Sequence, residues 1–103
     1  MPVILITGAN RGLGLEFVKQ YAELGWGVIA TARDPAAAPQ LAALAKEHRN
    51  VSIEALDVGD REAIKALAVR LVQKPIDVLL NNAGWRSEEH TSELQSRFGI
   101  SYA

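Results

Sequence analysis

The sequence predicts an α/β protein, in which helices cover both faces of a parallel sheet. Three observations lead to this fold class. Four short apolar segments alternate with three segments of helical periodicity. Only a few residues connect each segment to the next, and glycine or proline lies near most of these connections. Because strictly alternating strands and helices form right-handed crossovers, we expect a doubly wound parallel sheet.

The first three elements lie between residues 3 and 33. Residues 3–8, VILITG, form a continuous apolar run that ends in glycine, which is typical of a strand buried on both faces. Residues 12–24 carry apolar side chains at nearly helical spacing, and Gly25 is a natural stop for that helix. Residues 27–33, GVIATAR, are apolar and β-branched and predict the second strand.

The later elements lie between residues 39 and 80. They alternate helix, strand, helix and strand, and we expect them over residues 39–49, 51–58, 61–74 and 76–80. Asp60 is expected to cap the second of these helices, whose apolar residues follow an i, i+3, i+4, i+7 pattern. Pro75 ends that helix before the fourth strand.

Composition argues against several classes of function. The chain has 11 Lys and Arg against 12 Asp and Glu, so its charge gives no reason to expect nucleic acid or an anionic membrane as a partner. It has no cysteine, and neither His48 nor His90 has a partner at metal-ligand spacing, so no metal site is predicted. The apolar run 3–6 is too short to span a membrane and lacks the features of a signal peptide. We therefore expect a cytoplasmic protein.

A glycine-rich loop joins the first strand to the first helix. Its sequence is TGANRGLG, residues 7–14. Gly8 would allow the sharp turn, Gly12 would leave room for a diphosphate, and Gly14 would let the helix pack closely on the strand. The start of the helix would then offer free N–H groups and the positive end of its dipole to phosphates. A turn with glycines for purely steric reasons is the alternative for such a loop.

Two motifs together resemble a known family. Gly8, Gly12 and Gly14 have G-x-x-x-G-x-G spacing, and Asn-Asn-Ala-Gly (81–84) follows the fourth strand. These motifs resemble the TGxxxGxG and NNAG signatures of the short-chain dehydrogenase/reductase family, and residues 3–84 are most similar to its C-factor-like and sniffer-like carbonyl reductases. The resemblance implies a truncated Rossmann-type sheet of four strands in the order 3-2-1-4. It also implies a homo-oligomeric parent protein that acts on a small carbonyl or alcohol substrate.

The resemblance assigns cofactor contacts to individual residues. Those lining the diphosphate and the adenosine ribose would be Asn10, Arg11, Gly12, Leu13 and Gly14. Those contacting the adenine would be Asp57 and Val58. Those beside the nicotinamide-side ribose would be Asn82, Ala83 and Gly84. Asn81 would brace the sheet through side-chain hydrogen bonds, and a simple turn carboxylate is the structural alternative for Asp57.

The end of the second strand bears on the choice of cofactor. An acidic side chain there would bind both ribose hydroxyls, but the slot holds Ala32, followed by Arg33. The Arg33 guanidinium could pair with a 2′-phosphate, and Arg11 could supply a second positive charge. These two cations favour NADP(H). Asp34 as the ribose acid would instead favour NAD(H), and Arg33 would then be an ordinary surface arginine.

The resemblance also predicts what the sequence lacks. The family's proton-transfer residues are a serine and a Tyr-x-x-x-Lys pair downstream of NNAG. No lysine follows Lys74, and Tyr102 has only Ala103 behind it. We therefore expect residues 1–85 to be the cofactor-binding half of an oxidoreductase, with no catalytic residue on this chain. A non-catalytic dinucleotide-binding or signalling module is the alternative.

Residues 86–103 differ in character from the rest. Fifteen of the 16 alanines precede Trp85, whereas four of the five serines follow it. The run RSEEHTSELQS (86–96) is the in-frame translation of a common short-read sequencing adapter. The last four residues, ISYA, match the continuation of that adapter beyond a sample barcode. We expect residues 86–103 to be a non-native, disordered tail derived from the adapter, and a genuine serine-rich tail is the alternative.

Overall fold

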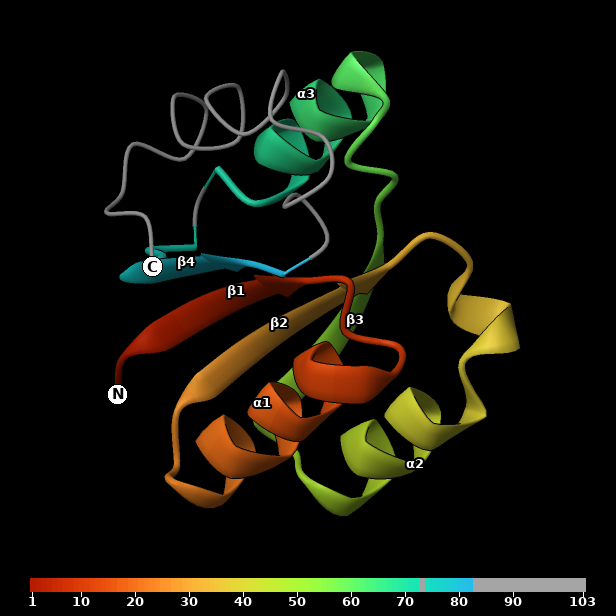
Figure 1. Ribbon diagram of the computed structural model, residues 1–103. Coiled ribbons are helices and arrows are strands. Elements are labelled where there is room, and N and C mark those ends of the chain that lie inside the picture. Colours follow the sequence, from red (N-terminus) through yellow and green to blue (C-terminus); the bar gives the residue numbers. More distant parts are fainter. Residues whose placement is uncertain (73, 83–103) are drawn as a thin grey trace.

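The computed structural model describes residues 1–72 and 74–82 (Figure 1). Ala83, Gly84 and the tail at 86–103 lie outside the described residues, as do the predictions made for them. The elements, in chain order, are β1 (Val3–Thr7), α1 (Gly12–Glu23), β2 (Gly27–Ala32), the short 3-10 helix η1 (Pro35–Ala37), α2 (Pro39–Glu47), β3 (Val51–Ala55), α3 (Arg61–Arg70) and β4 (Val78–Asn81).

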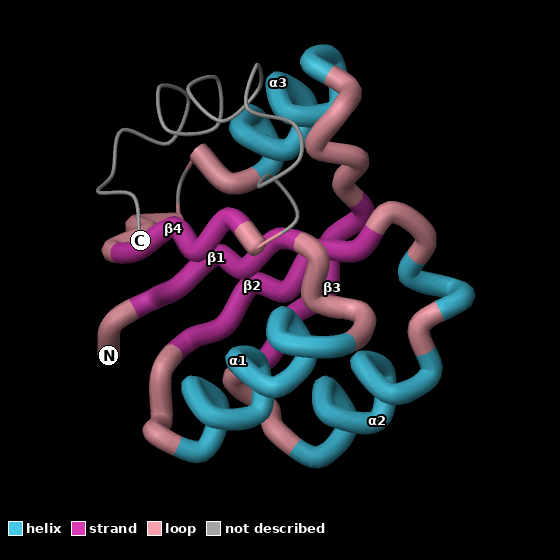
Figure 2. The backbone as a smooth tube through the Cα atoms, in the orientation of Figure 1, coloured by secondary structure: helices cyan, strands magenta, loops and turns pink. Residues whose placement is uncertain are grey.

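The four strands form one parallel sheet in the order β3-β2-β1-β4, which confirms the predicted order. Helices α1 and α2 cover one face of this sheet, and α3 covers the other (Figure 1). Because all strands are parallel, the loops that follow β1, β2 and β3 leave the same edge of the sheet (Figure 2). That edge is where a ligand crevice is expected in an open α/β sheet.

Two apolar clusters hold the layers together, one on each face of the sheet. Alternate side chains of a strand point to opposite faces, so Ile4 and Ile6 of β1 pack with Leu41 of α2. Leu5, between them, packs on the other face with Leu67 of α3. This division explains why the β1 sequence is apolar from Val3 to Ile6 instead of alternating.

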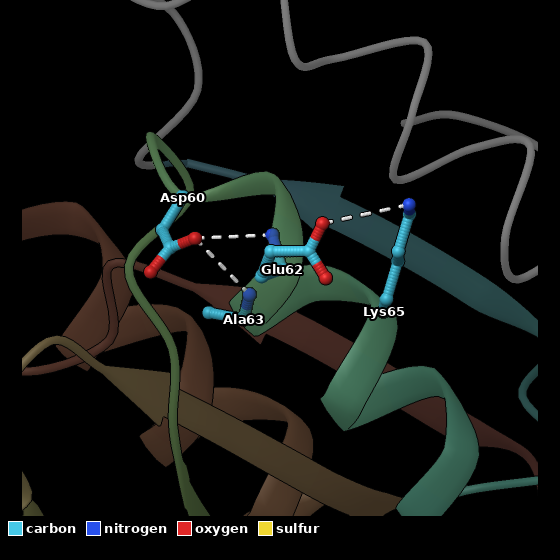
Figure 3. A network of polar contacts seen from close by, with 4 residues as sticks. All are labelled: Asp60, Glu62, Ala63 and Lys65. Carbon is cyan, nitrogen blue, oxygen red and sulfur yellow. Dashed lines mark hydrogen bonds and ion pairs between the residues drawn. The ribbon is translucent and has the colours of Figure 1, made fainter.

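Helix α3 begins as predicted, with Asp60 as its cap (Figure 3). The Asp60 Oδ1 atom accepts hydrogen bonds from the backbone N–H groups of Glu62, at 3.0 Å, and Ala63, at 3.3 Å. The Glu62 side chain, in the first turn, forms an exposed ion pair of 3.6 Å with Lys65, one turn further on. In the described part of the chain, no helix is both long and apolar enough to cross a membrane.

The third and fourth strands are shorter than predicted. β3 ends at Ala55 instead of residue 58, because its neighbour β2 ends at Ala32 and the last bond between them runs from Leu56 N–H to the Ala32 carbonyl, at 2.9 Å. The chain then turns, and the Asp57 carbonyl accepts a hydrogen bond from the Asp60 N–H group. β4 begins at Val78 instead of residue 76.

Candidate functional site

A cleft of about 860 Å³ opens at the carboxyl edge of the sheet. Loops that follow all four strands line it, and they bring together most of the residues that the sequence singles out. Those that line the cleft are Gly8, Asn10, Arg11, Gly12, Leu13, Arg33, Asp57, Val58 and Asn82. Gly14 is not part of the lining but is buried in the first turn of α1.

The glycine-rich loop turns sharply between β1 and α1. Gly8 and Gly12 have φ angles of 62° and 60°, which favour glycine over other residues. A Cβ atom at Gly12 would project into open space, so the absence of a side chain there keeps that part of the loop free. A Cβ atom at Gly14 would overlap the Gly8 carbonyl oxygen, so this glycine allows α1 to pack directly on the end of β1.

The start of α1 faces the cleft without a capping side chain. Its N-cap residue, Arg11, makes no side-chain hydrogen bond to the first turn, and that turn contains no acidic residue. The first N–H groups of a helix have no intrahelical partner, and they lie at the positive end of the helix dipole. This part of the cleft is therefore suited to an anionic group such as a phosphate.

Arg33 and Asp57 lie side by side at another part of the cleft. They follow β2 and β3, whose last paired residues are Ala32 and Ala55. The Arg33 Nε atom is 4.0 Å from the Asp57 Oδ2 atom, and the two side chains are 82% and 46% exposed. Solvent weakens an ion pair at such exposure, so this contact leaves the guanidinium able to bind another anion. Asp34, the alternative ribose acid, also lines the cleft.

The end of β4 is joined to the end of β1 by two side-chain amides. The Thr7 hydroxyl donates a buried hydrogen bond of 2.6 Å to the Asn81 Oδ1 atom, which confirms that Asn81 braces the sheet. The Asn82 Nδ2 atom donates a second bond, of 3.1 Å, to the Gly8 carbonyl. This second bond was not predicted, because the resemblance placed Asn82 only beside a ribose.

Three residues that line the cleft were not predicted from the sequence. They are Ala37, Leu56 and Gly59. Leu56 could have been found, because it ends an apolar run directly beside the predicted Asp57. Gly59 lies two residues after Asp57, and its N–H group donates a hydrogen bond of 2.9 Å to the Asp57 Oδ1 atom. Among residues 1–72 and 74–82, no group of three or more His, Asp and Glu side chains could hold a metal ion.

Known proteins are similar to this chain in sequence and in fold. A family model described as short chain dehydrogenase matches residues 2–98. An uncharacterized oxidoreductase of Schizosaccharomyces pombe is 44% identical over 85 residues, which cover 80% of this chain and 34% of the relative. The chain thus spans about a third of that relative's length.

Two solved structures with bound cofactor are similar in fold. One is a carbonyl reductase from chicken fatty liver with bound NADPH, with a TM-score of 0.84 and 33% identity over 95% of this chain and 47% of that one. The other is a short-chain dehydrogenase/reductase from Burkholderia multivorans with bound NADP, with a TM-score of 0.81 and 27% identity over 97% of this chain and 54% of that one.

Proposed function

This chain belongs to the short-chain dehydrogenase family, and we propose that it is the NADP(H)-binding part of an oxidoreductase that reduces a carbonyl or oxidises an alcohol. The residues that line the cleft support the cofactor. Membership of the family supports the reaction, because the chain itself covers only 34% of the Schizosaccharomyces pombe oxidoreductase.

The observation that carries the cofactor assignment is an uncapped helix start and two arginines in one cleft. The free N–H groups at the start of α1, beside the open space at Gly12, fit a diphosphate. Arg33, with Arg11, would bind the 2′-phosphate that distinguishes NADP(H) from NAD(H), and Asp57 and Val58 would contact the adenine. The NADP and NADPH bound to the two similar structures support this choice.

The described residues would bind and orient the cofactor, which supplies or accepts the hydride when bound. Asn82 would lie on the nicotinamide side, together with Ala83 and Gly84, which lie outside the described residues. The sequence contains no Tyr-x-x-x-Lys pair to exchange a proton with a substrate oxygen. We therefore propose that this chain alone binds the cofactor but does not turn over a carbonyl or an alcohol.

The cofactor proposal is tested by titrating the full 103-residue chain with NADPH and NADH and following nucleotide fluorescence. NADPH should bind about tenfold more tightly, which is what a charge-assisted hydrogen bond to the 2′-phosphate would supply. Arg33→Ala should remove most of this preference. Arg49→Ala is the matched control, because Arg49 is exposed and lies outside the cleft lining, and it should leave both affinities unchanged.

Two outcomes would contradict the cofactor proposal. Equal or tighter binding of NADH would favour Asp34 as the ribose acid. Failure to bind either nucleotide, with the chain shown to be folded by circular dichroism, would reject a dinucleotide site. Oxidation of NADPH with any carbonyl substrate would separately contradict the absence of turnover.

Binding without turnover would also be the result for a non-catalytic dinucleotide-binding module, which the missing Tyr-x-x-x-Lys pair favours as a second function.

A further inference from the structure

We propose that Asn82 is a positioning residue for the phosphate-binding loop, and that it acts through the Gly8–Ala9 peptide group without having to touch the cofactor. This inference rests on the proposed function, because it assigns the loop to the diphosphate. The hydrogen bond that carries it joins the Asn82 Nδ2 atom to the Gly8 carbonyl, at 3.1 Å.

The Gly8–Ala9 peptide group is held on both sides. Its carbonyl accepts the bond from Asn82, which directly follows β4. Its N–H group donates to the Thr31 carbonyl of β2, at 2.9 Å. β1 lies between β2 and β4 in the sheet (Figure 2), so this peptide just beyond β1 is clamped by Thr31 of β2 on one side and by Asn82, which follows β4, on the other.

The first turn of α1 meets this clamp directly. A Cβ atom at Gly14 would overlap the Gly8 carbonyl oxygen and would lie 2.9 Å from the Asn82 Nδ2 atom. The Gly8 carbonyl, the Asn82 amide and the backbone of Gly14 therefore meet at one point. Asn82 thus sets how the end of β1 faces the start of α1, where the free N–H groups lie.

The clamp restricts a peptide that would otherwise be free to move. Gly8 has a φ angle of 62°, and an unrestrained glycine exchanges readily between this conformation and others. Holding the peptide before the ligand arrives lowers the conformational entropy lost on binding. The loss of Asn82 should therefore weaken binding of the part of the cofactor that lies on the loop, and not of the part that lies near Arg33.

This difference is tested by comparing three ligands on Asn82→Ala. NADPH and 2′-phospho-ADP both contain the diphosphate, but 2′-phospho-ADP lacks the nicotinamide-side ribose, and 2′-AMP carries only the adenosine and the 2′-phosphate. The variant should bind NADPH and 2′-phospho-ADP each roughly three- to tenfold more weakly, the value of one net hydrogen bond, and should bind 2′-AMP as the unsubstituted chain does. Equal weakening of all three ligands, or weakening of NADPH without weakening of 2′-phospho-ADP, would overturn the proposal, as would no weakening of NADPH.

Asn50→Ala is the matched control for general destabilisation. The Asn50 Nδ2 atom also donates to backbone carbonyls, those of Ala22 at 3.0 Å and Trp26 at 2.7 Å, and Asn50 precedes β3, at the opposite edge of the sheet from the cleft. This variant should unfold at a lower urea concentration with both affinities unchanged. A change in NADPH affinity equal to that of Asn82→Ala would also overturn a role specific to Asn82.

A measurement on the unsubstituted chain tests the clamp even where Asn82→Ala does not fold. In NMR spectra without ligand, the Asn82 side-chain amide protons should exchange slowly and should show a nuclear Overhauser effect to the Gly14 Hα protons. Fast exchange with no such effect would overturn the proposal. If the chain does not bind NADPH but this signature is present, the proposed function fails and the clamp stands.

Discussion

Gly12 and Gly14 lie two residues apart in the sequence, but a methyl group would meet different surroundings at each. At Gly12 it would project into open space at the cleft, on a backbone with a φ angle of 60°. At Gly14 it would overlap the carbonyl oxygen of Gly8. Gly12 therefore serves the space that we assign to the ligand, whereas Gly14 serves the packing of α1 on the sheet.

The two glycines should respond differently to alanine. Gly14→Ala should lower the free energy of unfolding by about 2–3 kcal/mol, because backbone atoms must move to admit the methyl group. Gly12→Ala should lower it by about 1–2 kcal/mol through the unfavourable φ angle, and should reduce NADPH affinity more than its effect on folding explains. Urea unfolding and NADPH titration measure the two effects. A Gly14→Ala chain as stable as the unsubstituted one would contradict this account.

The sequence predicts the site only as far as local spacing reaches. The glycine spacing and the strand ends were enough to predict that Gly8, Arg33 and Asp57 lie in one cleft, because parallel strands end at the same edge. The clamp on Gly8 could not be predicted. Gly8 and Asn82 are 74 residues apart, and whether the Asn82 side chain reaches the Gly8 carbonyl depends on the register of β4 against β1.

At the scale of a single element, α3 depends on how it begins. Asp60 accepts hydrogen bonds from two backbone N–H groups at the start of the helix. Ile64 and Leu67 are completely buried. The cap satisfies N–H groups that would otherwise have no partner in the helix, while the apolar side chains supply most of the burial. The two contributions are separate, so a change to the cap should leave the packed face intact.

Asp60→Ala should therefore lower the free energy of unfolding by about 0.5–2 kcal/mol, as the loss of a helix cap usually does. Lys65→Ala is the matched control on the same helix, because it removes only an exposed ion pair and should change stability by less than about 0.5 kcal/mol. Urea unfolding monitored by circular dichroism would compare the two. The interpretation of Asp60 as a cap would be wrong if the control lost as much stability.

The elements themselves were predicted well where burial determines the sequence pattern. Strand β1 is buried on both faces, and its sequence is apolar without a break from Val3 to Ile6. The end of β3 was predicted wrongly because Leu56 and Val58 continue the apolar pattern after the partner strand has ended at Ala32. The short helix η1, which starts at Pro35, was not predicted, because a single 3-10 turn leaves no periodicity to read.

For the whole molecule, the parallel arrangement explains why one cleft receives residues from four separate loops. Each strand runs in the same direction, so each following loop begins at the same edge. Parallel strands need a crossover between them, and here a helix on one face or the other provides it. The cleft is therefore a consequence of the topology, and its chemistry is set by the few residues that follow each strand.

The hypothesis that residues 86–103 are a translated adapter makes a prediction about the gene. Source DNA amplified with primers well outside codon 85 should not encode RSEEHTSELQS after that codon. It should continue into a serine and a Tyr-x-x-x-Lys pair, and codons 1–85 should be unchanged. If the DNA encodes residues 86–103 and then a stop codon, the tail is genuine and the adapter hypothesis is wrong.

The clamp on the Gly8–Ala9 peptide also has a consequence for the order of events on the ribosome. The Thr31 carbonyl is available early, but the Asn82 amide lies 74 residues after Gly8. At roughly 5–20 residues per second, the ribosome adds that many residues in roughly 4–15 s. During this interval only one side of the peptide can be held. The loop after β1 is therefore synthesised well before the residue that completes its clamp, and it takes its final form only after β4 has been made.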